Sequence, residues 1–429
     1  MESYSFSEKL RESVVAAPPR KSKFAMAYFF SMGVGSLLAW NTILTAVDFF
    51  QVRFPSYNIS FLFPIPYIIG TILVNLFIVE IAHCVRLNAR VVGGIAMMCV
   101  IMATMPLSSS NLPEHIGFWV LMISLFVLAA ANIVSEASLI GMTALFPAVY
   151  IRFFQTGLGA AGLAVNALRM ICLATVGDSS SDYISIIVYF GLTLLVTIHC
   201  IVIHLRFIRT DTFKFYTHKI HHDRHNDSSV QVEPNAPELA GALVSNQETV
   251  EEKITQRPPK ATIALVLKEV YGSAILMVVI FIQTFMMFPG VTLKKNLSNM
   301  NSAWNTVILI TTYNLFDITG KSMAGFKRKT MKKFLPLVVL LRFSLYAPFI
   351  LVALKEKGWV EEDWVSLTVL ALFGLTNGYC SSSLYVIAPE QVENHKKETV
   401  GFIIQLSLYI GIALGTFLAL PLSNLGKDN

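Results

Sequence analysis

Charged side chains inside long apolar stretches are the residues of this sequence best placed to do chemistry. Glu136 stands in ANIVSEASLIG, and Asp317 and Lys321 stand in YNLFDITGKSMAG. At bilayer depth a charge costs at least about 2.5 to 3.5 kcal/mol, so each one needs a partner, a water-filled cavity or a function. Arg169 and Arg342 lie nearer the ends of their stretches, where they either reach the membrane surface or tie helices together.

Two interpretations remain open for the acidic residues. Asp317 and Lys321 are four residues apart and so share one helix face. They form either a structural ion pair or a donor and acceptor set for a substrate with hydroxyl groups. Glu136 has no charged neighbour in its own segment. It pairs across helices with Arg169 or Lys321, carries a proton, or is held neutral by helix–helix hydrogen bonds.

The composition indicates that most of this chain is embedded in a lipid bilayer. Charged residues make up 14% of the 429 residues and hydrophobic residues 54%, with a mean hydropathy of +0.61. Soluble domains carry about 25% charged residues. The net charge of +6 comes from Lys and Arg between hydrophobic segments, where they set membrane orientation and do not form a nucleic-acid groove. We expect an all-α polytopic membrane protein that binds no DNA or RNA.

The elements that must position these residues are transmembrane helices. A helix needs roughly 20 apolar residues to cross the hydrocarbon core, which predicts about eleven spans. They are expected near 24–47, 59–82, 90–109, 116–146, 154–177, 184–208, 263–290, 303–325, 334–354, 364–388 and 399–424.

Basic loops and one polar segment predict the orientation and the domains. Lys and Arg concentrate on the side of the amino terminus, which places that terminus in the cytosol and the carboxyl terminus outside. As a separate expectation, the membrane is the plasma membrane. The sequons at Asn58 and Asn296 then face outward as candidate glycosylation sites. We expect a cytosolic segment (1–23), a six-helix half (24–208), a disordered cytosolic linker (209–262) and a five-helix half (263–425).

No cofactor or metal is expected. The linker contains four histidines at helical spacing, but no carboxylate or cysteine completes a metal site. No span combines a nucleophile with a base, so we expect no enzymatic activity. The four histidines of the linker are His218, His221, His222 and His225.

Several segments together resemble the equilibrative nucleoside transporter family, in order and spacing. Matches run along the chain and omit mainly the linker. They are GVGSLLAWNTILTA, EASLIGMTALFP with GLGAAG, Phe288–Pro289–Gly290–Val291, the set Asn314, Asp317, Gly320 and Lys321, Thr376–Asn377–Gly378–Tyr379, and Gly411 with Gly415.

This resemblance implies a carrier of the major-facilitator type with a six-plus-five arrangement and a central site reached alternately from each side. It implies that Asp317 and Lys321 hold ribose hydroxyls, that Glu136 stands at the nucleobase position, and that Asn314 belongs to the same site. The residues that would line the cavity from the first span are Leu37, Trp40, Asn41 and Leu44.

Two positions depart from the family pattern. The family usually has Gln where this chain has Glu136, and an ionised carboxylate accepts hydrogen bonds without donating any. It usually has Arg where this chain has Lys321, a mobile point charge in place of a rigid fork. The first span, ALRMI and Ala388–Pro389–Glu390–Gln391 are closer to the plant branch, some of whose members are proton-coupled.

The expected function is therefore transport of nucleosides, with free nucleobases as a further cargo, either facilitated or coupled to protons. Two alternatives remain: a secondary transporter of another small polar solute, and a membrane scaffold or receptor whose buried charges are only structural.

Overall fold

The computed structural model describes residues 22–57, 59–176, 183–217, 260–325, 328–354 and 362–422. Within these ranges every regular element is a helix, which confirms the predicted all-α class. The first helix group comprises α2 (Lys23–Thr45), α3 (Val47–Arg53), α4 (Ile59–Leu62), α5 (Pro64–Leu76), α6 (Ile78–Cys84), α7 (Leu87–Asn111), α8 (Glu114–Thr143), α9 (Ala148–Val176) and α10 (Tyr183–Phe207).

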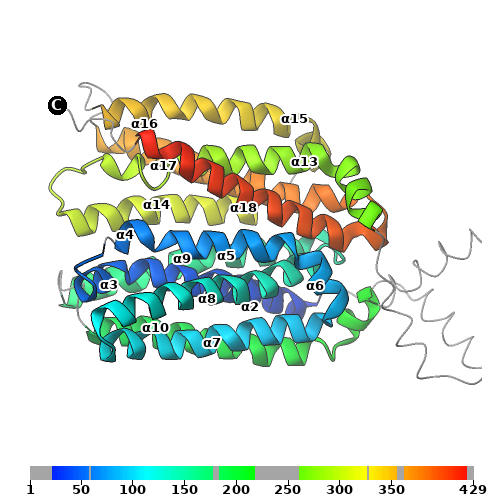
Figure 1. The fold of residues 1–429 in the computed structure, drawn as a ribbon. Helices are drawn as coiled ribbons and strands as arrows, with labels where there is room; N and C mark the ends of the chain where they lie inside the picture. Colours follow the sequence, from blue (N-terminus) through cyan, green and yellow to red (C-terminus); the bar gives the residue numbers. More distant parts are fainter. Residues whose placement is uncertain are drawn as a thin grey trace, which may run out of the picture.

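The second helix group follows the linker. It comprises α13 (Lys260–Met287), η1 (Thr292–Lys294), α14 (Ser302–Ser322), α15 (Arg328–Leu341), η2 (Arg342–Leu345), α16 (Tyr346–Ala353), α17 (Asp363–Ile387), η4 (Ala388–Gln391), η5 (Asn394–Lys396) and α18 (Lys397–Leu422). The two groups lie side by side as roughly parallel bundles, blue to green and green to red in Figure 1.

Eight helices of the described residues are long and apolar enough to cross a membrane. Helices α14 and α17, with 21 and 25 residues, are not among the eight, and α5 is a shorter apolar helix. These three coincide with predicted spans, so the number eleven stays a prediction. Both α14 and α17 carry polar residues of the candidate site described below, which lowers their hydropathy.

Two predicted spans are interrupted. The span predicted at 59–82 is divided into α4, α5 and α6. The span predicted at 334–354 is divided by η2, which ends three residues before Pro348. Proline has no N–H to donate to the carbonyl four residues earlier, so the chain takes a tighter turn before the helix resumes.

Helix α9 begins six residues earlier than predicted. The spans predicted at 116–146 and 154–177 leave residues 147–153 as a break between them, but the helix already starts at Ala148. Pro147 suits the start of a helix because the first N–H groups there have no helical partner. Arg152 therefore lies within the first turns of α9.

The start of the predicted linker is ordered. Residues 211–217 are helical, and Phe213 and Tyr216 pack against the hydrophobic core. The ring of Tyr216 lies 4.9 Å from that of Phe146, centroid to centroid. The rest of the predicted linker up to residue 259, with its four histidines, lies outside the described residues, as does the sequon residue Asn58. Asn296 is exposed.

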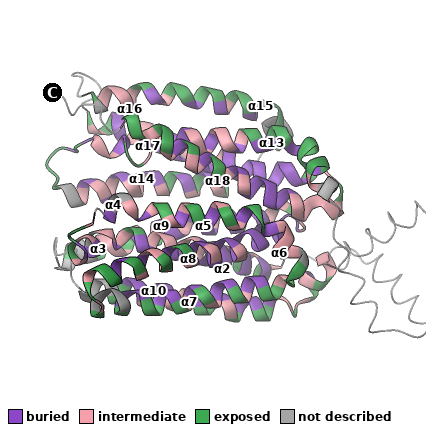
Figure 2. Ribbon diagram, in the orientation of Figure 1, coloured by how far each residue is buried: buried purple, intermediate pink, exposed green. Residues whose placement is uncertain are grey.

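Side chains exposed on the outside of the bundle are largely apolar. Leu195, Trp364 and Phe417 are 67%, 66% and 69% exposed. Figure 2 shows exposed residues along the outer faces of the helices, with buried residues concentrated between them. An outer surface of this kind is suited to lipid and unsuited to water, in agreement with the predicted polytopic membrane protein.

Among the described residues, the hydrophobic clusters that join the two helix groups lie toward one end of the bundle. The largest cluster joins the start of α2 and the end of α8 to the start of α13 and the end of α17. Near the opposite end, one cluster contains only residues 39–190 and another only residues 287–373. The end with the shared cluster is the predicted cytosolic end, so the groups are packed together there.

Candidate functional site

Asp317 and Lys321 form the ion pair that their spacing predicts. The Lys321 ammonium lies 2.7 Å from Asp317 Oδ2, and the two side chains are 14% and 7% exposed. Both residues stand on α14, about one turn apart. A buried carboxylate and a buried ammonium thus neutralise each other within one helix, and each keeps further hydrogen-bonding capacity.

Three glycines hold α14 directly against α17 around this pair. A Cβ atom added to Gly378 would collide with the Asp317 carbonyl oxygen, and one added to Gly374 would lie 2.6 Å from the Tyr313 carbonyl oxygen. Gly320 makes the reciprocal close approach to α17. Because the backbones touch, the position of Asp317 relative to α17 is fixed.

Asn377 on α17 binds the other oxygen of the same carboxylate. Its Nδ2 donates to Asp317 Oδ1 at 2.8 Å, and both residues are buried. Asn377 also accepts a hydrogen bond from Thr284 of α13 at 2.7 Å. In the sequence Asn377 stands out only as part of the motif Thr376–Asn377–Gly378–Tyr379, because its pairing with Asp317 depends on the packing of α14 against α17.

Glu136 is buried on α8 and receives hydrogen bonds from neutral groups of both helix groups. Tyr409 of α18 donates to Glu136 Oε2 at 2.9 Å, and Asn132 donates to the same oxygen at 3.2 Å. Neither pairing predicted for Glu136 is present as an ion pair in the described ranges. Lys321 pairs with Asp317 and reaches Glu136 only through a longer-range electrostatic interaction, and Arg169 donates to the Thr45 carbonyl oxygen.

An aromatic pair connects the first span to Glu136. The rings of Trp40 and Tyr67 are stacked, with centroids 3.9 Å apart. The Tyr67 hydroxyl accepts a hydrogen bond from Asn132 at 3.2 Å, and Asn132 in turn contacts Glu136. Trp40 of α2 is therefore linked through α5 to the carboxylate on α8.

The other residues predicted on α2 lie on the same helix face as Trp40. Leu37 and Asn41 are partly exposed and Leu44 is 42% exposed, whereas their neighbours Leu38 and Ile43 are buried. Asn41 donates to the Leu37 carbonyl oxygen at 3.0 Å, within its own helix. This face thus combines Trp40 with two leucines and one amide.

Asn314 lies at the contact between α14 and α9. A Cβ atom on Gly162 would lie 3.0 Å from Asn314 Nδ2, and one on Gly159 would lie 3.0 Å from Ile318 Cβ. The two glycines therefore allow the first and second helix groups to approach closely beside the Asp317 pair. Asn314 is partly exposed.

An ion pair and a close contact between two glycines hold the two helix groups together at the predicted cytosolic end. Arg90 of α7 forms an ion pair with Glu398 of α18 at 3.2 Å, and the Arg90 side chain is 3% exposed. A Cβ atom on Gly401 would lie 2.9 Å from the Gly141 Cα atom. This contact brings α8 and α18 together below Glu136.

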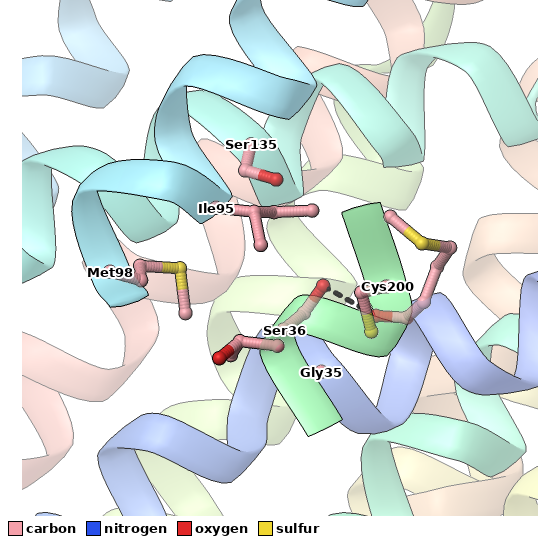
Figure 3. Close-up of a pocket in the computed structure, with 8 residues that line it drawn as sticks. Gly35, Ser36, Ile95, Met98, Ser135 and Cys200 are labelled. Carbon is pink, nitrogen blue, oxygen red and sulfur yellow. Dashed lines mark hydrogen bonds between the residues drawn. The ribbon is translucent and has the colours of Figure 1, made fainter. Parts of the chain in front are cut away.

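Two small pockets lie toward the same end and contain no predicted site residue. Figure 3 shows one of them, with Ser36, Ile95, Met98, Ser135 and Cys200 converging from helices of the first group. The other lies between α8, α17 and α18, and Tyr385 and Gly401 are among its lining residues. Among the described residues, no group of His, Cys, Asp or Glu is arranged to hold a metal ion.

Polar residues of both helix groups thus lie inside an apolar bundle. The sequence that builds this bundle is similar to known proteins. The family model described as nucleoside transporter matches residues 122–423. The chain belongs to the nucleoside transporter family. The match includes most of α8, with Glu136, and the whole of α14, with Asp317 and Lys321.

Curated relatives of this family member come from plants and mammals. "Equilibrative nucleotide transporter 1" of Arabidopsis thaliana is 25% identical over 95% of this chain and 88% of its own length. "Equilibrative nucleoside transporter 2" of Mus musculus is 24% identical, with 91% of this chain and 95% of its own length covered. "Equilibrative nucleoside transporter 1" of Homo sapiens is 26% identical, with 93% and 96% covered. Plant and mammalian relatives match about equally well.

Solved structures confirm the predicted major-facilitator fold. A proton:xylose symporter of the major facilitator superfamily superimposes with a TM-score of 0.63 at 11% identity, over 94% of this chain and 89% of that one. The E. coli fucose:proton symporter gives a TM-score of 0.55 at 13% identity, over 94% and 92%. At these identities the likeness concerns the fold alone.

Four residues of the network around Glu136 are not among the residues predicted from the sequence. Asn132, Tyr67 and Tyr409 each bond to Glu136 or to a direct neighbour of it. Gln405 accepts a hydrogen bond from Tyr385 at 2.6 Å and lies next to Glu136. The spacing in the sequence could have indicated two of them. Asn132 precedes Glu136 by four residues and Gln405 precedes Tyr409 by four, so each pair shares one helix face.

Proposed function

We propose that this chain carries nucleosides across a membrane, and free nucleobases by the same route, through alternating access between the two helix groups. The observation that carries the proposal is that three ionisable residues from both groups lie within electrostatic range of one another. Lys321 is paired with Asp317 and also interacts electrostatically with Glu136. An acceptor and a donor for hydroxyl groups thus lie near an acceptor for a nitrogenous base.

Each predicted site residue has a role in this proposal. Asp317 and Lys321 bind the ribose hydroxyls, and Glu136 binds the base edge. Trp40 offers an aromatic face on which a base stacks, a contact worth about 1–3 kcal/mol per base in nucleic-acid binding proteins. Support comes from its position, because Trp40 is partly exposed and already stacks on Tyr67. Leu37, Asn41, Leu44 and Asn314 complete the lining.

The proposed arrangement in the cell follows the charge distribution. The amino-terminal segment (1–23) and the linker (209–262) face the cytosol, the carboxyl terminus faces outward, and the membrane is the plasma membrane. The helix halves are residues 24–208 and 263–425. Transport requires no catalytic step in this scheme, so the protein acts as a carrier and not as an enzyme.

A competition panel tests the substrate class. Cells that express the chain take up labelled adenosine, and unlabelled nucleosides, free bases, sugars and amino acids compete in turn. We expect saturable uptake that nucleosides reduce and that sugars and amino acids leave unchanged. Uptake equal to that of cells without the protein, or competition by sugars alone, contradicts the proposal.

Coupling to protons is a second candidate, favoured by the surroundings of Glu136. In the described ranges its hydrogen-bond partners are neutral amides and a hydroxyl, with no cation within ion-pair distance. A carboxyl group in such a place is suited to binding and releasing a proton. Adenosine uptake at several external pH values distinguishes the two mechanisms. Coupling through this residue requires that acidic external pH increases adenosine uptake by the parent and that uptake by Glu136→Gln does not change with pH. Equal, pH-independent uptake by both excludes it.

A further inference from the structure

Arg342 is a fully buried cation whose role is not explained by membrane anchoring. It is 1% exposed and stands in η2, at the interruption between α15 and α16. The alternative that it reaches the membrane surface is therefore wrong, and the alternative that it ties helices together is confirmed. Within the described ranges no carboxylate lies at ion-pair distance. Its guanidinium contacts Ile280 O, Gln283 Oε1, Thr284 Oγ1, Thr376 Oγ1 and the Phe373 ring.

One of these contacts begins a chain of hydrogen bonds that ends at the candidate substrate site. Arg342 Nη2 donates to Thr284 Oγ1 at 3.0 Å, and Thr284 contacts Asn377 Oδ1 at 2.7 Å. Asn377 Nδ2 then donates to Asp317 Oδ1 at 2.8 Å. The chain crosses η2, α13, α17 and α14 in that order. Arg342 and Asp317 also interact electrostatically.

The two ends of this chain determine the direction of every bond in it. A guanidinium can only donate hydrogen bonds and an ionised carboxylate can only accept them. Asn377 must therefore turn its NH2 group toward Asp317 and its oxygen toward Thr284. Thr284 accepts from Arg342 and, because the Asn377 oxygen can only accept, donates its single hydrogen to Asn377, for which the Ile280 carbonyl oxygen at 2.8 Å competes. The Asp317 carboxylate orients Asn377, and the bond that Arg342 donates to Thr284 Oγ1 holds the Thr284 hydroxyl in place beside Asn377.

Asp317 is consequently held at both oxygens, with Asn377 on Oδ1 and Lys321 on Oδ2. A carboxylate has about four lone-pair positions, so two remain for a ligand. With both oxygens fixed, those two positions point in defined directions. Hydroxyl groups of a ribose need acceptors in such a fixed arrangement, because misdirected hydrogen bonds weaken steeply.

We propose that Arg342 is a positioning residue for ribose recognition, acting on Asp317 through Thr284 and Asn377. This inference rests on the proposed function, in which Asp317 binds ribose hydroxyls. Arg342 also has a purely structural arm, because it donates to Gln283, and Gln283 donates to the Val339 carbonyl oxygen at 2.7 Å. A test must therefore interrupt the chain at Thr284 and leave the structural arm intact.

Thr284→Val removes the hydroxyl and keeps the size of the side chain. Thr71→Val is a matched control, since Thr71 and Thr284 are both 2% exposed and both donate to the carbonyl oxygen four residues earlier at 2.8 Å. Thr71 differs because it contacts neither Asn377 nor Arg342. Thr284→Ser retains the hydroxyl and should restore the chain. Surface abundance and melting temperature are measured for every variant.

The readout is the KM for uptake of a labelled ribonucleoside, compared with the KM for its 2′,3′-dideoxy counterpart. Uptake rates are divided by the amount of protein at the surface. For Thr284→Val we expect the ribonucleoside KM to rise about fivefold, the scale of one hydrogen bond, with the dideoxy KM within about twofold of the parent. Thr284→Ser and Thr71→Val should keep the parent ratio. A general structural role would instead change both KM values together.

Arg342→Lys keeps the charge but loses the planar fork, so it should raise the same KM. In the Thr284→Val background it should add little, because the chain is already interrupted. Proportional changes in both KM values, or no change, for Thr284→Val overturn the inference. A parent that transports both compounds with equal KM overturns ribose binding by Asp317. A parent that transports no nucleoside overturns the proposed function.

Discussion

Two buried carboxylates, Asp317 and Glu136, stand in the same bundle with opposite surroundings. Asp317 has a cation one turn away on its own helix, and all its described side-chain partners belong to the second helix group. Glu136 has neutral partners, and one of them, Tyr409, belongs to the other helix group. One carboxylate is thus fixed within a group, while the other joins the two groups.

This difference assigns separate tasks in alternating access. When the groups move apart and together, the contacts of Asp317 persist, because α13, α14, α15 and α17 move as one group. The bond between Glu136 and Tyr409 must break, because it crosses from α8 to α18. We therefore expect Asp317 to determine binding, and Glu136 to influence both base selection and the exchange between states.

The largest effect is expected for Asp317→Asn. It leaves Lys321 as an unpaired buried cation, and breaking such a pair costs about 3–5 kcal/mol. Uptake per molecule should fall by at least about tenfold and the melting temperature should drop. Asp363→Asn, at a more exposed position, provides the matched control. If Asp317→Asn lowers abundance alone and each molecule still transports normally, Asp317 has only a structural role.

An intermediate effect is expected for Glu136→Gln. The amide both donates and accepts, so a base with a carbonyl oxygen at this position, as in inosine, should gain a donor, and a base with an amino group there, as in adenosine, should lose a charged acceptor. Relative competition by inosine and adenosine should change by about fivefold, the scale of one hydrogen bond, while total uptake persists. Competition by 2′,3′-dideoxy analogues provides the internal control. An unchanged order of competition would remove Glu136 from base recognition.

A smaller effect is expected for Tyr409→Phe, which deletes the bond between the groups and keeps the ring. Loss of about 1 kcal/mol shifts the balance of two states by about fivefold at most. The initial uptake rate should change within that limit. Tyr385→Phe is the matched control, since the Tyr385 hydroxyl bonds to Gln405 and not to Glu136. Equal changes in both variants contradict a special role for the Tyr409 contact.

The smallest effect is expected at Asp363, just before the predicted span at 364. Burial alone raises the pKa of this carboxyl, but the hydrogen bond from the Ser298 N–H at 2.9 Å and the ion pair with Lys295 at 3.1 Å outweigh it and lower the pKa. A carboxyl whose pKa is lowered by folding stabilises the fold at pH values above its unfolded pKa of about 3.9. This stabilisation is lost as the pH falls toward the pKa of the folded state. The gain is less than about 1 kcal/mol because the side chain is partly exposed.

Melting curves in detergent check this pH dependence. The parent should melt slightly higher than Asp363→Asn at pH 7, and the difference should vanish on acidification. A difference that grows in acid contradicts the assigned direction. Asp317→Asn should show a large difference at pH 7, which separates the buried pair from the exposed one.

The sequence predicted those features that depend on local pattern. The all-helical class, the membrane environment and the pairing of Asp317 with Lys321 follow from hydropathy and four-residue spacing. Helix interruptions before Pro348 were missed because apolar composition continues through them. The partners Asn377, Thr284 and Tyr409 could not be predicted, since they come from helices far apart in the sequence and meet only through glycine contacts such as Gly378 against Asp317.

The most direct test uses purified protein in proteoliposomes, where no other transporter contributes. We predict saturable uptake of labelled adenosine that excess unlabelled nucleoside abolishes and that Asp317→Asn reduces at equal protein content. Uptake indistinguishable from that of protein-free liposomes, with the parent protein folded and inserted, would contradict nucleoside transport by this chain.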